Sequence, residues 1–456
     1  MKLRTVGKKE KSEYTMFSNR ALAALIFPLV VEQVLAITVG MVDTMMISYA
    51  GEAAISGVSL VDMINTVIIN IFAAVAAGGS VVISQYIGKK KKEQACSAAD
   101  QLIMITVLIS LGLTLLTLSG RRPLLAALFG SIEADVMENA LIYLVISAYS
   151  YPFLAVFNSC AAVLRSIGNS RLPMYVSVGM NVMNAIGNAI LIFGFSMGVA
   201  GAAWSTFASR ATAAVVMFFI LLNHKYEVHL TPRQIFTWQD SLIRKILYIA
   251  VPSGVENGIF QFGRVIVVSI IAVFGTVQIA ANAVANNLDA MGCIAGQAMN
   301  LAMITVVGQC IGAGDEKQAA YYIKKLLKIT YFFTWGVNSV ILAALPWILK
   351  IYTLSDEARS LAFLLIVIHN GFAMLLWPTS FTLSHALRAT GDVKYTMAVS
   401  VFSMCAFRIC FSGILGVYLG LGAVGVWIAM VMDWVFRVTL FVTRFVKGKW
   451  KGKSVV

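Results

Sequence analysis

Twelve long apolar runs, separated by polar segments, constrain the fold of this chain more than any other feature of its sequence. About 20 apolar residues in a row are enough to cross a bilayer as an α-helix. Hydrophobic residues make up 59% of the chain and charged residues only 12%, whereas soluble domains carry about 25% charged residues. The sequence therefore predicts an all-α integral membrane protein with twelve transmembrane helices. The expected spans are 21–47, 55–87, 97–119, 136–164, 172–194, 198–222, 245–274, 279–311, 322–349, 360–387, 395–417 and 422–446.

Lys and Arg residues gather in every second connecting segment. Of the 35 in the chain, 27 lie in segments on one side of the predicted membrane, and only Arg121, Arg122, Lys350 and Arg359 lie on the other. Because short basic segments remain in the cytoplasm, we expect a multi-pass protein of the cell membrane with both termini cytoplasmic. The net charge of +14 then reflects topology and attraction to the lipid bilayer, and no nucleic-acid partner is expected.

An internal repeat relates the two halves of the sequence. Pro28 corresponds to Pro252 and Glu32 to Glu256, with an offset of 224 residues. Since six is an even number of helices, the two copies have the same orientation, as in parallel repeats of secondary transporters. The sequence thus predicts two pseudo-symmetric six-helix bundles. The expected segments are a cytoplasmic N-terminal tail (1–20), an N-lobe (21–222), a cytoplasmic linker (223–244), a C-lobe (245–446) and a cytoplasmic C-terminal tail (447–456).

The first apolar run contains a proline, Pro28, and two acids, Glu32 and Asp43. An ionised carboxylate in lipid costs several kcal/mol, so these acids should face protein or water. Their spacing places both on one helix face, roughly 16 Å apart, and Pro28 favours a bend before them. This pattern indicates a cation-responsive helix that lines a polar cavity. Burial of the acids in purely structural hydrogen bonds is the alternative.

Further polar residues lie inside the later spans. Asp433 and Arg437 are four residues apart, so we expect them to neutralise each other on one helix face. Arg264, Arg408 and Asp289 lie on different predicted helices and could form an interhelical pair. The sequence alone does not assign that pair.

No motif of catalysis or cofactor binding is present in the sequence. There is no nucleophile–base pair, phosphate-binding loop or dinucleotide motif, and the six cysteines are too scattered to suggest a metal site or a disulfide framework. We therefore expect a non-enzymatic protein without catalytic residues or a cofactor, whose energy comes from an ion gradient. The one metal ion considered is Na⁺ at Asp43.

Five sequence segments together resemble the multidrug and toxic compound extrusion (MATE) transporters. They are Pro28, VDT at Val42–Thr44, RSIGNSRLP at Arg165–Pro173, LIFG–MGVAGAA within Leu191–Ala203, and LRATGD at Leu387–Asp392. The resemblance implies two bundles around a V-shaped cleft. It also implies export of small organic compounds, often cationic or amphipathic, in exchange for H⁺ or Na⁺. We expect the chain to act as a monomer.

The resemblance further implies a cation site in the N-lobe and a bend at Pro28. The matching positions for the site are Asp43, Asn184, Asn188 and Thr206. Asn188 is an amide where some branches of the family have an aspartate. Its carbonyl can bind Na⁺ but cannot carry a proton near neutral pH, which leaves Asp43 as the main titrating group. Another branch has acids in the second lobe, but here those positions are apolar, near Phe260 and Trp377.

Four residues are candidates for contacting a cationic substrate in the cleft. They are Glu32, Gln33, Glu256 and Asn257. Two other functions remain open. A flippase for lipid-linked precursors would use a more basic cleft, and four arginines inside the spans (Arg210, Arg264, Arg408 and Arg437) keep this alternative open. A membrane scaffold or receptor would show no ion-dependent transport.

Overall fold

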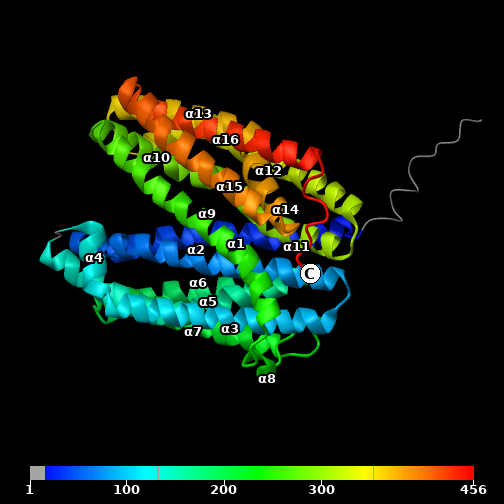
Figure 1. Cartoon of the computed structure of the whole chain (residues 1–456). Coiled ribbons are helices and arrows are strands. Elements are labelled where there is room, and N and C mark those ends of the chain that lie inside the picture. Colours follow the sequence, from blue (N-terminus) through cyan, green and yellow to red (C-terminus); the bar gives the residue numbers. More distant parts are fainter. Residues whose placement is uncertain (1–15, 131–132, 353) are drawn as a thin grey trace, which may run out of the picture.

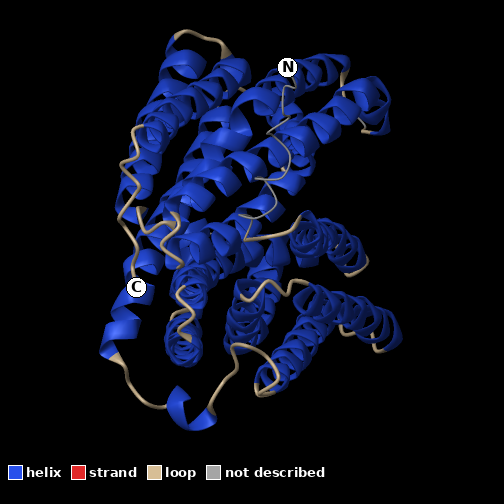
Figure 2. Cartoon of the chain, turned by 90° about the vertical axis from the view of Figure 1, so that its right-hand side faces the viewer, coloured by secondary structure: helices blue, strands red, loops and turns tan. Residues whose placement is uncertain are grey.

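A computed structural model describes residues 16–130, 133–352 and 354–456, and these residues form helices and loops without a strand (Figure 2). Within these residues, twelve helices are long and apolar enough to cross a membrane, which confirms the predicted fold class. Most of the predicted N-terminal tail lies outside the described residues. The helices of the first half are α1 (Asn19–Ser48), α2 (Glu52–Gly88), α3 (Lys92–Ser119), α4 (Arg121–Phe129), α5 (Ala134–Ser166), α6 (Arg171–Asn188) and α7 (Gly198–Leu221).

The second half repeats this arrangement after a short linker helix. Its helices are α8 (Pro232–Ile235), α9 (Asp240–Ala272), α10 (Thr276–Gly292), α11 (Ile294–Gly312), α12 (Glu316–Ile351), α13 (Asp356–Trp377), α14 (Leu383–Ala389), α15 (Val393–Ser403) and α16 (Gly422–Val446). In the described part of the chain, four π-helical segments extend or connect these helices: Ala189–Gly194, Pro378–Thr382, Met404–Phe411 and Gly413–Tyr418. The two bundles meet near the C-terminus and separate towards α4 and α10 (Figure 1).

The predicted span 279–311 is not one helix. It is divided at Cys293 into α10 and α11. Gly292 has no Cβ, so the Asn338 side chain of α12 packs closely against it and donates a hydrogen bond to its carbonyl at 3.3 Å. This bond competes with the hydrogen bonding that would continue the helix, and glycine itself has a low helix propensity. The sequence prediction of a continuous span is wrong here.

The contact between the bundles repeats with the sequence. Gln85 of α2 donates to the carbonyl of Ala389 at 2.9 Å, and Gln309 of α11 donates to the carbonyl of Ser166 at 2.6 Å. Gln309 corresponds to Gln85 in the repeat, and Ala389 corresponds to Ser166. Each lobe therefore donates one buried hydrogen bond to the other. These paired bonds fix the register of the two bundles at the end where they meet.

Replacing Gly312 with alanine is expected to destabilise this contact. An added Cβ at Gly312 would overlap the backbone carbonyl of Gln85 on the opposite helix, and a backbone group cannot move aside cheaply. Overpacking of this kind costs about 1–3 kcal/mol or more. Gly336→Ala in α12 is the matched control because nothing lies within 4 Å of its added Cβ. Thermal unfolding of the purified protein should show a lower midpoint for Gly312→Ala only, and equal midpoints would contradict the prediction.

The C-terminal segment lies across both bundles. The Val455 backbone donates to the Gln85 side chain of the N-lobe at 2.9 Å. Lys453 pairs with Asp392 of the C-lobe at 2.8 Å, and the Gly452 backbone donates to Glu316 at 2.9 Å. The expected tail at 447–456 is thus packed against the seam between the bundles rather than projecting away from them.

Candidate functional site

Three helices of the N-lobe bring the four predicted cation-site residues together. Asp43 comes from α1, Asn184 and Asn188 from α6, and Thr206 from α7. The Asn188 amide donates to Asp43 Oδ1 at 2.7 Å. When the Asn184 amide is oriented so that its oxygen accepts from Thr206 Oγ1 at 3.1 Å, its nitrogen lies 2.8 Å from Asp43 Oδ1 and 3.2 Å from Oδ2. This orientation gives both the oxygen and the nitrogen of the Asn184 amide a hydrogen-bond partner, and amide directions are assigned from such networks.

The Asn188 side chain has one polar atom without a partner. Asn188 is only 1% exposed, and its Oδ1 makes no hydrogen bond within the described part of the chain. Leaving a buried acceptor unpaired costs about 1–3 kcal/mol. The α-helix also changes to a π-helical segment directly after Asn188, and such segments occur frequently at functional sites. The Asp43 carboxylate and the free Asn188 oxygen are both electron-pair donors. Such oxygen atoms can ligate Na⁺ or accept hydrogen bonds from hydronium.

A second carboxylate near this cluster was not selected from the sequence. Asp62 of α2 accepts a hydrogen bond from Asn65 at 3.3 Å, and Asn65 accepts one from the Tyr151 hydroxyl at 2.9 Å. The charges of Asp62 and Arg210 both act electrostatically on Asp43. Two carboxylates against one arginine leave the centre of the N-lobe negative. The signal in the sequence was an acid inside an apolar run, with an asparagine three residues later on the same helix face.

The two glutamates expected in the substrate cleft are both paired with arginine. Glu32 pairs with Arg165 at 2.6 Å. Its repeat equivalent, Glu256, pairs with Arg388 at 2.6 Å and lies 3.7 Å from Arg437. The duplication has therefore preserved an ion pair, not only a carboxylate. Since each carboxylate is neutralised within the protein, the geometry favours a structural role over direct binding of a cationic substrate.

The remaining sequence candidates lie next to these pairs or near the start of α1. Gln33 and Asn257 are half-buried, and neither makes a side-chain hydrogen bond to another described residue. Pro28 is buried within α1, which continues as a helix on both sides of it. A bend at Pro28 therefore stays a prediction about another conformation of the protein.

The expected pairing of Asp433 with Arg437 is wrong. Asp433 instead lies 3.9 Å from Arg408 and accepts a hydrogen bond from Ser403 on the neighbouring helix. Arg437 points towards Glu256. A spacing of four residues places two side chains on one helix face. It does not decide whether partners on adjacent helices offer better geometry, and here they do.

Asp289 also has a partner that the sequence did not indicate. Its Oδ1 lies 2.8 Å from His369 Nε2 and accepts from the Cys293 thiol at 3.2 Å. The ligand atoms of Asp289, Cys293 and His369 lie within 4.8 Å of one another, a spacing that could hold a metal ion. The sequence pattern indicated no metal beyond Na⁺ at Asp43. This group is not visible as a motif because Asp289 and His369 belong to different helices, α10 and α13.

The second-lobe positions without acids contain an aromatic cluster. Phe260 and Trp377 both pack on Phe381, with ring centroids 6.3 Å and 4.9 Å apart, respectively. Phe381 also lies beneath the Arg437 guanidinium, 4.5 Å from its ring centre. The aromatic residues at these positions stabilise the Arg437 cation through its contact with a ring face. They offer no carboxylate that could bind a coupling ion.

Two repeated six-helix bundles with carboxylates and amides facing one another between their helices define the architecture of a membrane transporter. The MatE family model matches residues 28–190 and 252–414, two segments with the same offset as the internal repeat. The chain therefore belongs to the MatE family. This result confirms the resemblance drawn from the sequence.

Individual relatives match along almost the whole chain. "Uncharacterized transporter YisQ" of Bacillus subtilis is 28% identical, over 95% of this chain and 96% of the relative. "Probable multidrug resistance protein NorM" of Thermotoga maritima is 27% identical, over 97% of this chain and 98% of the relative. A solved structure described as the outward-facing conformation of a multidrug resistance MATE family transporter of the MOP superfamily superposes with a TM-score of 0.88. It is 20% identical and covers 94% of this chain and 96% of its own, so this similarity concerns the fold.

Proposed function

We propose that this protein exports cationic or amphipathic organic compounds across the cell membrane in exchange for H⁺ or Na⁺. Its relative from Thermotoga maritima is described as a probable multidrug resistance protein, which supports this class of substrate. The distribution of Lys and Arg supports a cytoplasmic location for both termini. The protein works as a monomer without a cofactor, and the coupling ion supplies the energy.

The observation that carries the proposal is the carboxylate–amide cluster in the N-lobe. Asp43 is held at 2.7 Å by the Asn188 amide, whose buried oxygen has no hydrogen-bond partner among the described residues. A monovalent cation at this position would neutralise Asp43 and use the free oxygen of Asn188. The nearby Asp62 carboxylate increases the attraction for a positive charge.

The proposed exchange depends on the hydrogen bonds of this cluster. The negative charge of Asp43 orients the amide N–H groups of Asn184 and Asn188. When a proton or Na⁺ neutralises Asp43, this orienting interaction is weakened. Helix α1 then bends at Pro28, and the substrate is released outside. The ion must bind the two conformations with different affinities, because equal affinities would shift nothing.

A flux assay with imposed gradients tests the proposal. Purified protein in liposomes is given a fluorescent organic cation, and a pH gradient or a Na⁺ gradient is applied in separate experiments. We expect efflux that depends on one of the two gradients and stops when an ionophore collapses it. Transport that occurs without any gradient would contradict antiport. Absence of flux under both gradients would instead favour a scaffold or receptor.

A further inference from the structure

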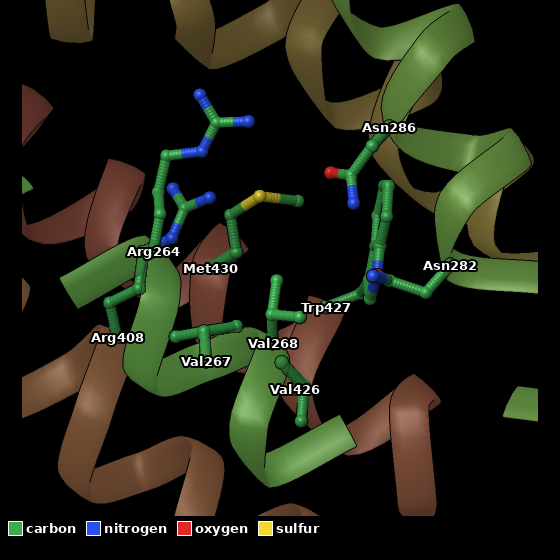
Figure 3. A pocket seen from close by; sticks show the side chains of 9 residues that line it. All are labelled: Arg264, Val267, Val268, Asn282, Asn286, Arg408, Val426, Trp427 and Met430. Atoms are coloured by element: carbon green, nitrogen blue, oxygen red, sulfur yellow. The ribbon is translucent and has the colours of Figure 1, made fainter. Parts of the chain in front are cut away.

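A small cavity in the C-lobe contains two arginines. It lies between α9, α10, α16 and the π-helical segment at Met404–Phe411, and its volume is about 40 Å³. Arg264 and Arg408 direct their guanidinium groups into this space, with Asn286 across from them (Figure 3). The remaining wall is largely apolar, formed by valine side chains, Trp427 and Met430.

The positive charge of this cavity is only partly neutralised. Arg408 lies 3.9 Å from Asp433, and that carboxylate is also engaged by Ser403. Arg264 makes no ion pair with any residue in the described ranges, although it lies well inside α9. Asp289 is held by His369 at 2.8 Å and does not line the cavity. A charged arginine inside a membrane helix costs several kcal/mol unless it faces a polar space or an anion.

The polar groups of the cavity offer hydrogen-bond donors. A guanidinium group has five N–H donors and no acceptor. The Asn282 oxygen already accepts from Trp427 Nε1 at 3.0 Å, so the amide nitrogen of Asn282 is the part left available. Two guanidinium groups and an amide nitrogen match a group that only accepts hydrogen bonds and carries negative charge. Arginine binds carboxylate with a particularly suitable geometry.

We propose that this cavity binds the carboxylate of an amphipathic organic substrate. The cavity is far smaller than the roughly 300–1,000 Å³ of a pocket for a drug-sized molecule, so it holds the acidic group while the rest of the substrate lies outside it. The inference rests on the proposed export function and makes its substrate class more specific. The protein would export zwitterionic compounds with an affinity that simple organic cations do not reach.

A matched pair of dyes tests this proposal. A rhodamine ethyl ester carries only a positive charge, and its free acid carries the same ring system with an added carboxylate. Efflux of each dye is measured from liposomes of neutral phosphatidylcholine under the gradient that drives transport. For Arg264→Gln we expect the half-saturating concentration of the free acid to rise about tenfold, because a charge-assisted hydrogen bond is lost. The value for the ester should stay unchanged, and Arg264→Lys should restore part of the loss.

Arg121→Gln is the matched control, since Arg121 is an exposed arginine of α4. If Arg264→Gln weakened transport of both dyes equally, or of neither, the carboxylate site would be rejected while the export function remained. If the unaltered protein exported neither dye under any gradient, the export function itself would fail. Adding phosphatidylglycerol to the liposomes tests whether the cavity binds a lipid headgroup instead of the substrate carboxylate. If this lipid inhibited efflux of the free acid, and if the inhibition disappeared in Arg264→Gln, the cavity would be assigned to lipid and the proposal overturned.

Discussion

Replacing Asp43 with asparagine is expected to abolish gradient-driven efflux while the protein still folds. Asparagine has nearly the same shape, and its oxygen can still accept the 2.7 Å hydrogen bond from Asn188. The variant cannot carry the negative charge that a proton or Na⁺ would neutralise. Without that charge, the ion has no differential affinity for the two conformations and cannot drive exchange. We expect at least a tenfold lower efflux rate in the imposed-gradient assay.

The control for this variant is Asp135→Asn, because Asp135 is an exposed acid in the first turn of α5. It should transport at the rate of the unaltered protein. The thermal unfolding midpoints of both variants should equal the midpoint of the unaltered protein. This measurement separates loss of coupling from loss of folding. Full gradient-driven efflux by Asp43→Asn would reject Asp43 as the coupling group.

The second large effect is expected from the repeated glutamate–arginine pairs. Glu256→Gln should destabilise the protein more than Glu32→Gln. Removing one member of a buried ion pair costs about 3–5 kcal/mol because a buried charge is left uncompensated. Loss of the Glu256 charge removes the neighbouring anion of both Arg388 and Arg437. Loss of the Glu32 charge removes the anion of Arg165 alone. The equivalent residue in the other lobe thus serves as an internal control.

Thermal unfolding in detergent measures this difference. The midpoint should fall further for Glu256→Gln than for Glu32→Gln, and both should fall below the unaltered protein. Combining Glu256→Gln with Arg388→Met should recover part of the loss, since the uncompensated cation is then removed as well. Equal midpoints for the two single variants would show that Arg437 does not depend on Glu256.

The N-lobe cluster illustrates how far the sequence could reach. Asp43 stood out as an acid inside an apolar run, and the resemblance to a family added Asn184, Asn188 and Thr206. The structure brings all four within hydrogen-bonding contact. Asp62 was visible as a polar residue in the next run, yet its position near Asp43 required the packing of α2 against the rest of the lobe.

The sequence by itself determined the twelve apolar helices, the basic segments between them and the duplication, because these depend on composition and on spacing along one chain. Only the tertiary structure decided which charges meet. Local spacing suggested Asp433 with Arg437, but Asp433 lies by Arg408 and Arg437 by Glu256. Asp289 likewise lies by His369, a residue of another helix. Pairing between helices depends on their rotation and depth relative to one another, which the pattern along a single helix does not specify.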